Sequence, residues 1–266
     1  MGKRLAVEIV IPVYNEEAAL VPCVDKLRSF LEENFDHDWG IVIANNGSTD
    51  RTLEIATELG AADKRIRVLH LDRKGRGLAL RTAWGRSSAD IVSYMDVDLS
   101  TNLRYFPLLV EGLRCGYDVA VGSRLMQASI VARRLKREVL SRGFNLLIRL
   151  LFRTRFTDAQ CGFKALKRET AQALLPHVVN NSWFFDAELL ILAEKNNFRI
   201  FEAPVEWMED LDSRVNLTAT AIEDITGLAR MRSRRLNLKL PRQGKGSGLA
   251  LETTRPPGRA GGKIAG

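Results

Sequence analysis

Residues 89–98, with the sequence ADIVSYMDVD, join an apolar run to two acids that stand one residue apart. The run 91–95 is typical of a buried strand, and Asp96 and Asp98 follow directly at its carboxyl end. Ligands of open α/β sheets bind at the carboxyl ends of the strands. Carboxylate oxygens suit Mg²⁺ or Mn²⁺, which commonly bind through one or two carboxylates together with substrate phosphates. The segment therefore predicts a metal site at the edge of a sheet, held by Asp96 and Asp98.

Strand-like and helix-like patterns alternate along the chain up to this segment. Apolar, β-branched runs predict strands at 7–13, 39–44, 65–71 and 91–95. Helical spacing of apolar residues predicts helices at 17–33, from about 51, and from 74 to about 87. Such alternation predicts an α/β fold with a mixed, mostly parallel sheet, right-handed crossovers and flanking helices.

The pattern becomes mixed beyond residue 100. We expect helices at about 105–115, 133–152, 183–195 and 217–236, and strands at 118–122 and 199–205. Residues 241–266 are rich in Gly, Pro, Lys and Arg and have little to bury, which is typical of a disordered segment. We therefore expect a single domain over residues 1–236, ending in an amphipathic helix at about 217–236, and a basic tail over 237–266.

The charge of the chain is concentrated at one end. The net charge of the 266 residues is +8, and residues 230–266 contain ten Lys or Arg and one Glu. The remainder is therefore close to neutral, which argues against a uniformly basic nucleic-acid binder. Three cysteines without CxxC spacing and three scattered histidines indicate neither a disulfide framework nor a zinc site. We expect Cys161 to be a packed small residue and not a nucleophile.

No stretch of the sequence approaches the ~18 uninterrupted apolar residues that a transmembrane helix needs, and the first residues lack the apolar stretch of a signal peptide. We therefore expect a cytoplasmic protein without a transmembrane helix, associated peripherally with the inner face of the membrane. The oligomeric state cannot be derived from the sequence.

A series of motifs extends this pattern over most of the chain. In chain order they are VIPVYNE (10–16), NGSTD (46–50), GRGLAL (75–80), MDVDLS (95–100), GSR (122–124), DAQCGFK (158–164) and WFFDAELL (183–190). Together they resemble the family 2 glycosyltransferases, which have the Rossmann-like GT-A fold, and the resemblance covers residues 7 to about 235. Within that family the chain looks most like the synthases of dolichyl-phosphate mannose and dolichyl-phosphate glucose.

The resemblance implies a metal-dependent, inverting transferase. Its donor would be a nucleotide sugar, UDP-glucose or GDP-mannose, and its acceptor a polyprenyl phosphate of the dolichyl type at the cytoplasmic membrane face. Mannose-type and glucose-type features coexist. The longer motifs of the second half favour UDP-glucose slightly.

The resemblance also implies roles for individual residues. Those that bind the nucleotide sugar would be Pro12, Tyr14, Glu16, Asn45, Asn46, Asp50, Lys74, Arg76 and Asp96. The catalytic residues would be Asp96, Asp98, Arg124, Asp158, Gln160 and Asp186. A phosphomonoester, with its second pKa near ~6, is already a nucleophile at neutral pH and needs cations more than a base. Arg124, Arg137 and Ser141 would receive it, since an arginine fork suits phosphate.

One departure from the family pattern concerns the nucleoside site. The family commonly has two aspartates where this chain has Asn45 and Asn46, and one of those acids contacts the base. An amide oxygen accepts a hydrogen bond without a charge, so the bond should be weaker. The change puts the base specificity in question more than the activity.

Two helical segments have the pattern of membrane-surface helices. Leu140, Phe144, Leu147 and Leu151 share one face of the first, which is either part of the core or a membrane face. The second carries an apolar face that includes Leu217, Ala221, Ile225 and Leu228, followed by the arginines 230, 232, 234 and 235. Basic amphipathic helices of this kind lie at the interface of anionic bilayers.

Two other functions remain open at this point. A transferase acting on a sugar or lipid hydroxyl would need a carboxylate as general base, and Asp186 or Asp210 would be the candidates. A nucleotide-binding regulatory module without catalysis is suggested only by the Asn45-Asn46 replacement.

Overall fold

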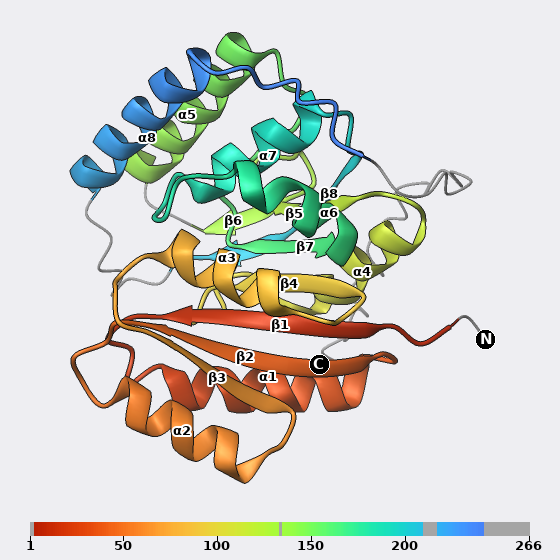
Figure 1. Ribbon diagram of the computed structural model, residues 1–266, viewed down its shortest axis with the longest axis vertical. Helices are drawn as coiled ribbons and strands as arrows, with labels where there is room; N and C mark the ends of the chain where they lie inside the picture. Colours follow the sequence, from red (N-terminus) through yellow and green to blue (C-terminus); the bar gives the residue numbers. More distant parts are fainter. Residues whose placement is uncertain (1–2, 133–134, 210–216, 242–266) are drawn as a thin grey trace, which may run out of the picture.

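The computed structural model of the chain describes residues 3–132, 135–209 and 217–241. These residues form one domain around a seven-stranded mixed sheet of order β3-β2-β1-β4-β7-β5-β8, and β6 pairs separately with β9. Helices lie on both faces of the large sheet (Figure 1). The fold class predicted from the sequence is therefore confirmed.

The first half of the chain is a run of parallel strands and covering helices. Its strands are β1 (Ala6–Val13), β2 (Asp38–Asn46), β3 (Ile66–Leu71) and β4 (Ile91–Met95). Its helices are α1 (Leu20–Asn34), α2 (Thr52–Ala62) and α3 (Arg76–Arg86). The parallel pairs β1–β2, β1–β4 and β2–β3 bring the carboxyl ends of these strands to one edge of the sheet. All seven elements agree with the sequence prediction to within a few residues.

The second half adds three strands to the large sheet and most of the remaining helices. The strands are β5 (Val119–Ser123), β7 (Phe163–Lys167) and β8 (Ile200–Pro204), with the short pair β6 (Ile130–Ala132) and β9 (Glu206–Met208). The helical elements are η1 (Leu103–Tyr105), α4 (Phe106–Arg114), α5 (Leu135–Phe152), α6 (Arg168–Leu174), η2 (Leu175–His177), α7 (Phe185–Lys195) and α8 (Leu217–Arg232). The sequence prediction missed β6, β7, β9, α6, η1 and η2.

β7 is the largest of these omissions, because it runs antiparallel between β4 and β5 and joins the two halves of the sheet. Its sequence FKALK contains Lys164, which is fully buried. A lysine in the middle of a short apolar run breaks the pattern by which buried strands are recognised. The physical reason for its burial is an ion pair inside the site described below.

Residues of β1, β2 and β4 alternate between two cores, one on each face of the sheet. Ile9 and Ile11 pack on one side, and Val10, between them, packs on the other. Both faces are covered, which explains why these strands are almost uninterrupted apolar runs. The core beneath α3 and α7 contains Trp84 and Tyr94, which are fully buried.

The chain remains packed past the predicted domain end at residue 236. The backbone N–H of Leu238 donates to Asn196 Oδ1 at 2.8 Å, and Leu238 and Leu240 pack against the core. Packing therefore continues past residue 236, and the predicted division into a domain and a basic tail stays a prediction. Residues 242–266 lie outside the described residues.

α5 and α8 lie next to each other along one side of the molecule (Figure 1). Their inner faces carry the buried residues Ile148, Phe152, Leu228 and Met231. Of the apolar stripe on α5, Leu140, Leu147 and Leu151 are exposed, and Phe144 packs partly on the core. The stripe is thus largely a surface feature. None of the described helices is both long enough and apolar enough to cross a bilayer.

Candidate active site

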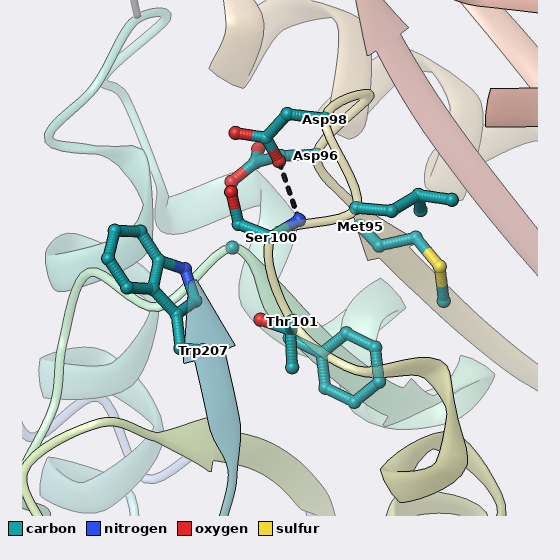
Figure 2. A pocket seen from close by; sticks show the side chains of 9 residues that line it. Met95, Asp96, Asp98, Ser100, Thr101 and Trp207 are labelled. Atoms are coloured by element: carbon teal, nitrogen blue, oxygen red, sulfur yellow. Dashed lines mark hydrogen bonds between the residues drawn. The ribbon is translucent and has the colours of Figure 1, made fainter. Parts of the chain in front are cut away.

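The two acids that follow β4 sit at the edge where the parallel strands end. The side chain of Asp96 is 42% exposed, and Asp98 is exposed with its Oδ1 accepting the Ser100 N–H at 2.9 Å. Leu99, directly after Asp98, has φ of 46°, which turns the chain sharply. Figure 2 shows both carboxyl groups at a small pocket whose other walls include Thr101 and Trp207.

Gly162 fixes the position of Asp96. A Cβ atom on Gly162 would lie 1.7 Å from Asp96 Oδ2, so no side chain fits there while Asp96 keeps its place. The Asp96 N–H donates to the Gly162 carbonyl oxygen at 3.3 Å. The loop before β7 therefore holds Asp96, the acid that follows β4. Glycine is needed at position 162 because the Asp96 side chain approaches its Cα closely, and not because of the backbone conformation.

Arg76, at the start of α3, bridges two of the predicted site acids. Its Nη2 and Nε lie 3.1 and 3.3 Å from Asp96 Oδ1, and its Nη1 lies 2.5 Å from Asp186 Oδ2. The guanidinium also lies 5.2 Å from the centre of the Trp183 ring. The sequence analysis assigned Arg76 to the donor phosphates. The structure pairs it with the carboxylates of Asp96 and Asp186, and its contact with the donor phosphates stays a prediction.

Asp186 is buried among cations. Lys164 Nζ lies 2.8 Å from Asp186 Oδ1, and the Tyr94 hydroxyl donates to the same oxygen. Burial alone would raise the pKa of Asp186, but Lys164 and Arg76 outweigh it and hold the pKa below the usual value. Asp186 is therefore a carboxylate engaged in ion pairs. Such an environment lowers its basicity.

Lys164 is a site residue to which the sequence analysis gave no role. Its Nζ donates to the carbonyl oxygens of Cys161 at 2.6 Å and Ala159 at 3.2 Å. It thus ties the loop that carries Asp158, Gln160 and Gly162 to Asp186 on α7. The only signal for it in the sequence is its place in the DAQCGFK motif.

Arg124 and Asp158 form a bidentate ion pair. Arg124 Nε lies 2.7 Å from Asp158 Oδ2, and Arg124 Nη2 lies 2.9 Å from Asp158 Oδ1. Burial would raise the pKa of Asp158, but Arg124 lowers it to about 2. Gln160 adjoins the pair through its backbone N–H, which donates to Asp158 Oδ1 at 3.1 Å. The arginine fork expected at the acceptor phosphate is held in position by this carboxylate.

The other two residues assigned to the acceptor phosphate lie on α5. Arg137 Nη1 lies 2.9 Å from Glu209 Oε1. Ser141 is buried, and its Oγ has no hydrogen-bond partner among the described residues. The ion pairs and hydrogen bonds found in the described chain join neither of them to Arg124. Assembly of the three around one phosphate stays a prediction.

The two asparagines that replace the usual acids tie the loops together. Asn45 Nδ2 lies 2.8 Å from His70 Nδ1, and Asn45 Oδ1 accepts the Ser48 N–H at 3.3 Å. Asn46 Nδ2 donates to the Val13 carbonyl at 2.7 Å, while its Oδ1 accepts the Gly75 N–H at 3.1 Å. Both side chains are buried. Their side-chain amides therefore hold the loops at this edge of the sheet in place through hydrogen bonds.

The remaining residues assigned to the nucleotide surround the same loops. Pro12 is buried within β1, and the Lys74 ammonium lies 3.8 Å from the centre of the Tyr14 ring. The Glu16 N–H donates to Thr52 Oγ1 at 2.8 Å, and Asp50 Oδ1 accepts the Thr52 N–H at 3.0 Å. Asp50 thereby fixes the start of α2. Of these residues Lys74 is exposed, whereas Tyr14, Glu16 and Asp50 are half-buried.

Cys161 agrees with its predicted role as a packed residue. It is fully buried, and burial raises the pKa of its thiol to about 12. A thiol that stays protonated at neutral pH is a poor nucleophile.

The donor set fits a divalent cation shared with phosphates. Among the described residues, no group of three or more His, Cys, Asp and Glu side chains could hold a metal ion. Asp96 and Asp98 offer hard oxygen ligands only, which suits an ion that completes its coordination with water and substrate oxygens.

This edge of the sheet carries every motif on which the family resemblance depends. A sequence profile described as glycosyl transferase family 2 matches residues 8–175. The chain belongs to glycosyl transferase family 2. The match begins in β1 and ends at η2, and it contains both acids of the Asp-x-Asp run.

Individual relatives point in the same direction. Glycosyltransferase AglD of Haloferax volcanii is 42% identical over 84% of this chain, which spans 35% of AglD. A dolichyl-phosphate beta-glucosyltransferase of Trichomonas vaginalis is 33% identical over 79% of this chain, and the match covers 66% of that enzyme's length. The chain thus covers about a third of the first relative and just under two thirds of the second.

A solved structure supports the fold. The structure matches that of glucosyl-3-phosphoglycerate synthase from Mycobacterium tuberculosis in complex with UDP, with a TM-score of 0.64 and 21% identity. The match covers 86% of this chain and 80% of the synthase chain. The same enzyme has also been crystallised with Mn²⁺, UDP and glucosyl-3-phosphoglycerate.

Proposed function

We propose that the chain is a metal-dependent transferase that moves a hexose from a nucleotide sugar to a polyprenyl phosphate, with UDP-glucose the favoured donor. The observation that carries the proposal is the grouping of Asp96 and Asp98 with the buried cluster of Arg76, Lys164 and Asp186 at the carboxyl edge of the sheet. Relatives named dolichyl-phosphate beta-glucosyltransferase support the choice of sugar and acceptor.

The donor would lie along the loops that follow β1, β2 and β4. Asp96 and Asp98 would hold Mg²⁺ or Mn²⁺, and the chemistry such an ion supplies is neutralisation of charge on the leaving nucleoside diphosphate. Tyr14 and Lys74 flank the nucleoside side of this edge. Arg76, already at Asp96, can add its cation to the diphosphate without leaving the site.

A phosphate acceptor agrees with the electrostatics better than a hydroxyl acceptor does. A hydroxyl must lose a proton to a base, and Asp186, the candidate base within the described residues, is paired with Arg76 and Lys164 and has a lowered pKa. Asp210, the other candidate, lies outside the described residues. A phosphate dianion needs no base, and Arg124 is the cation that would orient it.

A membrane surface is the place where such an acceptor is found, and α5 and α8 offer a face for it. Both helices carry exposed apolar side chains, which are Leu135, Val139, Leu140, Leu146, Leu147, Leu150 and Leu151 on α5 and Ile222 and Ile225 on α8. Arg232, the last residue of α8, and Arg235, just beyond it, are also exposed. Arg230 and Arg234 instead pair with the buried Glu188, so only part of the arginine cluster is available to lipid head groups.

The test of the activity is transfer of labelled sugar from UDP-glucose and from GDP-mannose, in parallel, to a short polyprenyl phosphate with Mg²⁺ or Mn²⁺. We expect lipid-extractable label from UDP-glucose, lost on EDTA treatment and in Asp98→Ala. Thr226→Ala, on the outer surface of α8, is the matched control and should keep full activity. No label from either donor, while UDP still binds, would exclude the proposed acceptor.

A further inference from the structure

α8 is seated on the site by a set of close contacts. A Cβ atom on Gly227 would lie 2.4 Å from Phe184 Cδ1, so the helix backbone touches the residue that precedes α7. Glu223 Oε1 accepts the Asn180 side-chain amide at 3.0 Å and the Phe184 N–H at 3.2 Å. These contacts fix both the depth and the rotation of α8 at this point.

Asp224 points inward from the same turn. It is 5% exposed, and its Oδ2 accepts the Gln160 Nε2 amide at 2.8 Å. Its Oδ1 is buried without a hydrogen-bond partner among the described residues. A buried carboxyl oxygen without a partner costs free energy. Its presence beside a site motif therefore calls for an explanation other than stability.

Asp224 is linked to Arg124 through a short chain of contacts. Gln160 connects to Asp158 through its own N–H, at 3.1 Å, and Asp158 grips Arg124 through both oxygens. A displacement of Gln160 therefore acts on the carboxylate that orients the arginine fork. The contact also connects this fork to the helix that exposes Ile222 and Ile225.

We propose that Asp224 is a positioning residue, which holds the Gln160 side chain and through it the Asp158–Arg124 pair in the geometry that receives the acceptor phosphate. The inference rests on the proposed transfer to a phosphate acceptor. It makes α8 part of the acceptor site, so that seating of the helix and acceptor binding are coupled.

The protonation state of Asp224 gives the test a specific signature. Burial raises the pKa of Asp224 to about 7, with Glu223 on α8 and Asp186 on α7 adding to the effect and the Gln160 hydrogen bond opposing it. An ionised carboxylate is the stronger acceptor for the Gln160 amide. The contact should therefore tighten as the pH rises through about 7.

The experiment compares the full-length wild type with Asp224→Asn, Asp224→Leu and the control Thr226→Ala, using UDP-glucose, Mn²⁺ and a short polyprenyl phosphate from pH 5.5 to 8.5. Asp224→Leu should raise the acceptor KM about tenfold and leave the donor KM unchanged, because a hydrogen bond to a charged group contributes on this scale. Asp224→Asn should have an acceptor KM close to that of the wild type. Its acceptor KM should lack the pH dependence that arises from ionisation of Asp224. The titration of the acceptor phosphate is common to all variants and cancels in the comparison.

Two results would overturn the inference. One is an unchanged acceptor KM in Asp224→Leu. The other is a fall in kcat and melting temperature without a selective change in acceptor KM, which a merely structural role would produce. If Asp224→Leu fails to fold, the acceptor KM of Asp224→Asn as a function of pH decides the question. A pH profile identical to that of the wild type would exclude the positioning role of Asp224.

Failure of the proposed function can be told apart from failure of this inference. If the wild type transfers no sugar, the proposed function is wrong. The Gln160 side-chain amide signal of ¹⁵N-labelled protein, assigned with Gln160→Ala, then decides the inference. A signal that moves with pH near 7 in the wild type and not in Asp224→Asn supports it, and one that does not move overturns it.

Discussion

The guanidinium of Arg76 lies 3.1 Å from Asp96, one of the two acids proposed to hold the metal. The same side chain reaches Asp186 at 2.5 Å, so one cation is shared between Asp96 and an acid of the buried cluster. In this arrangement α3 positions both carboxylates. Arg76 therefore supports Asp186 in the structure, and in the proposed function it would also contact the diphosphate.

The first prediction concerns Arg76→Ala. We expect kcat/KM to fall by at least about 10²-fold and the free energy of unfolding to fall by about 3–5 kcal/mol, because Asp186 loses one of its two buried cations. Urea denaturation and initial rates measure the two effects. Arg86→Ala, at the exposed end of the same helix, should change neither. A stable, fully active Arg76→Ala protein would show that the bridge is dispensable.

A second prediction follows from Gly162. Gly162→Ala places a methyl group where Asp96 Oδ2 lies, so Asp96 must turn away and Mn²⁺-dependent UDP binding should weaken by at least about tenfold. Calorimetric titration of UDP with and without Mn²⁺ measures this. Gly85→Ala is the matched control, because its added Cβ would meet no other part of the described chain within 4 Å beyond its neighbours and its own helix backbone. It should stabilise α3 by up to about 1 kcal/mol. Equal UDP affinity in Gly162→Ala and wild type would exclude Asp96 as a ligand.

The sequence predicted those parts of the fold whose signals are local. β1 to β4 are continuous apolar runs, and the acids after β4 follow one of them directly. β7 has no comparable signal, since Lys164 interrupts it and its partner Tyr94 lies 70 residues earlier in the chain. The partners of the site arginines were missed for the same reason. Arg76 meets Asp186 across 110 residues, and only tertiary packing decides that contact.

A third prediction concerns the acid stability that the Arg124–Asp158 pair provides. The pKa of Asp158 falls from its usual 3.8 to about 2, so the folded state binds the proton less tightly than the unfolded state. The pair therefore stabilises the fold fully above about pH 4, and this contribution is lost as the pH falls towards 2. The stability difference between the wild type and Asp158→Asn, measured in urea, should accordingly shrink over this range. Asp38→Asn, which removes an exposed partner of Arg4, is the control and should cost at most about 1 kcal/mol.

The last prediction concerns the apolar face of α5 and α8. Leu150→Glu combined with Ile222→Glu should abolish sedimentation with anionic liposomes, because both side chains are exposed, at 70% and 65%, on the proposed membrane face. Their replacement should leave the core intact, so UDP binding should not change. Leu108→Glu, on α4, is the control for added charge on an exposed apolar residue and should still sediment. A chain ending at residue 241 retains the packed segment through Leu240 and lacks the basic residues beyond it. If this shortened chain loses liposome binding while the double variant keeps it, the basic tail and not the helical face is the membrane contact.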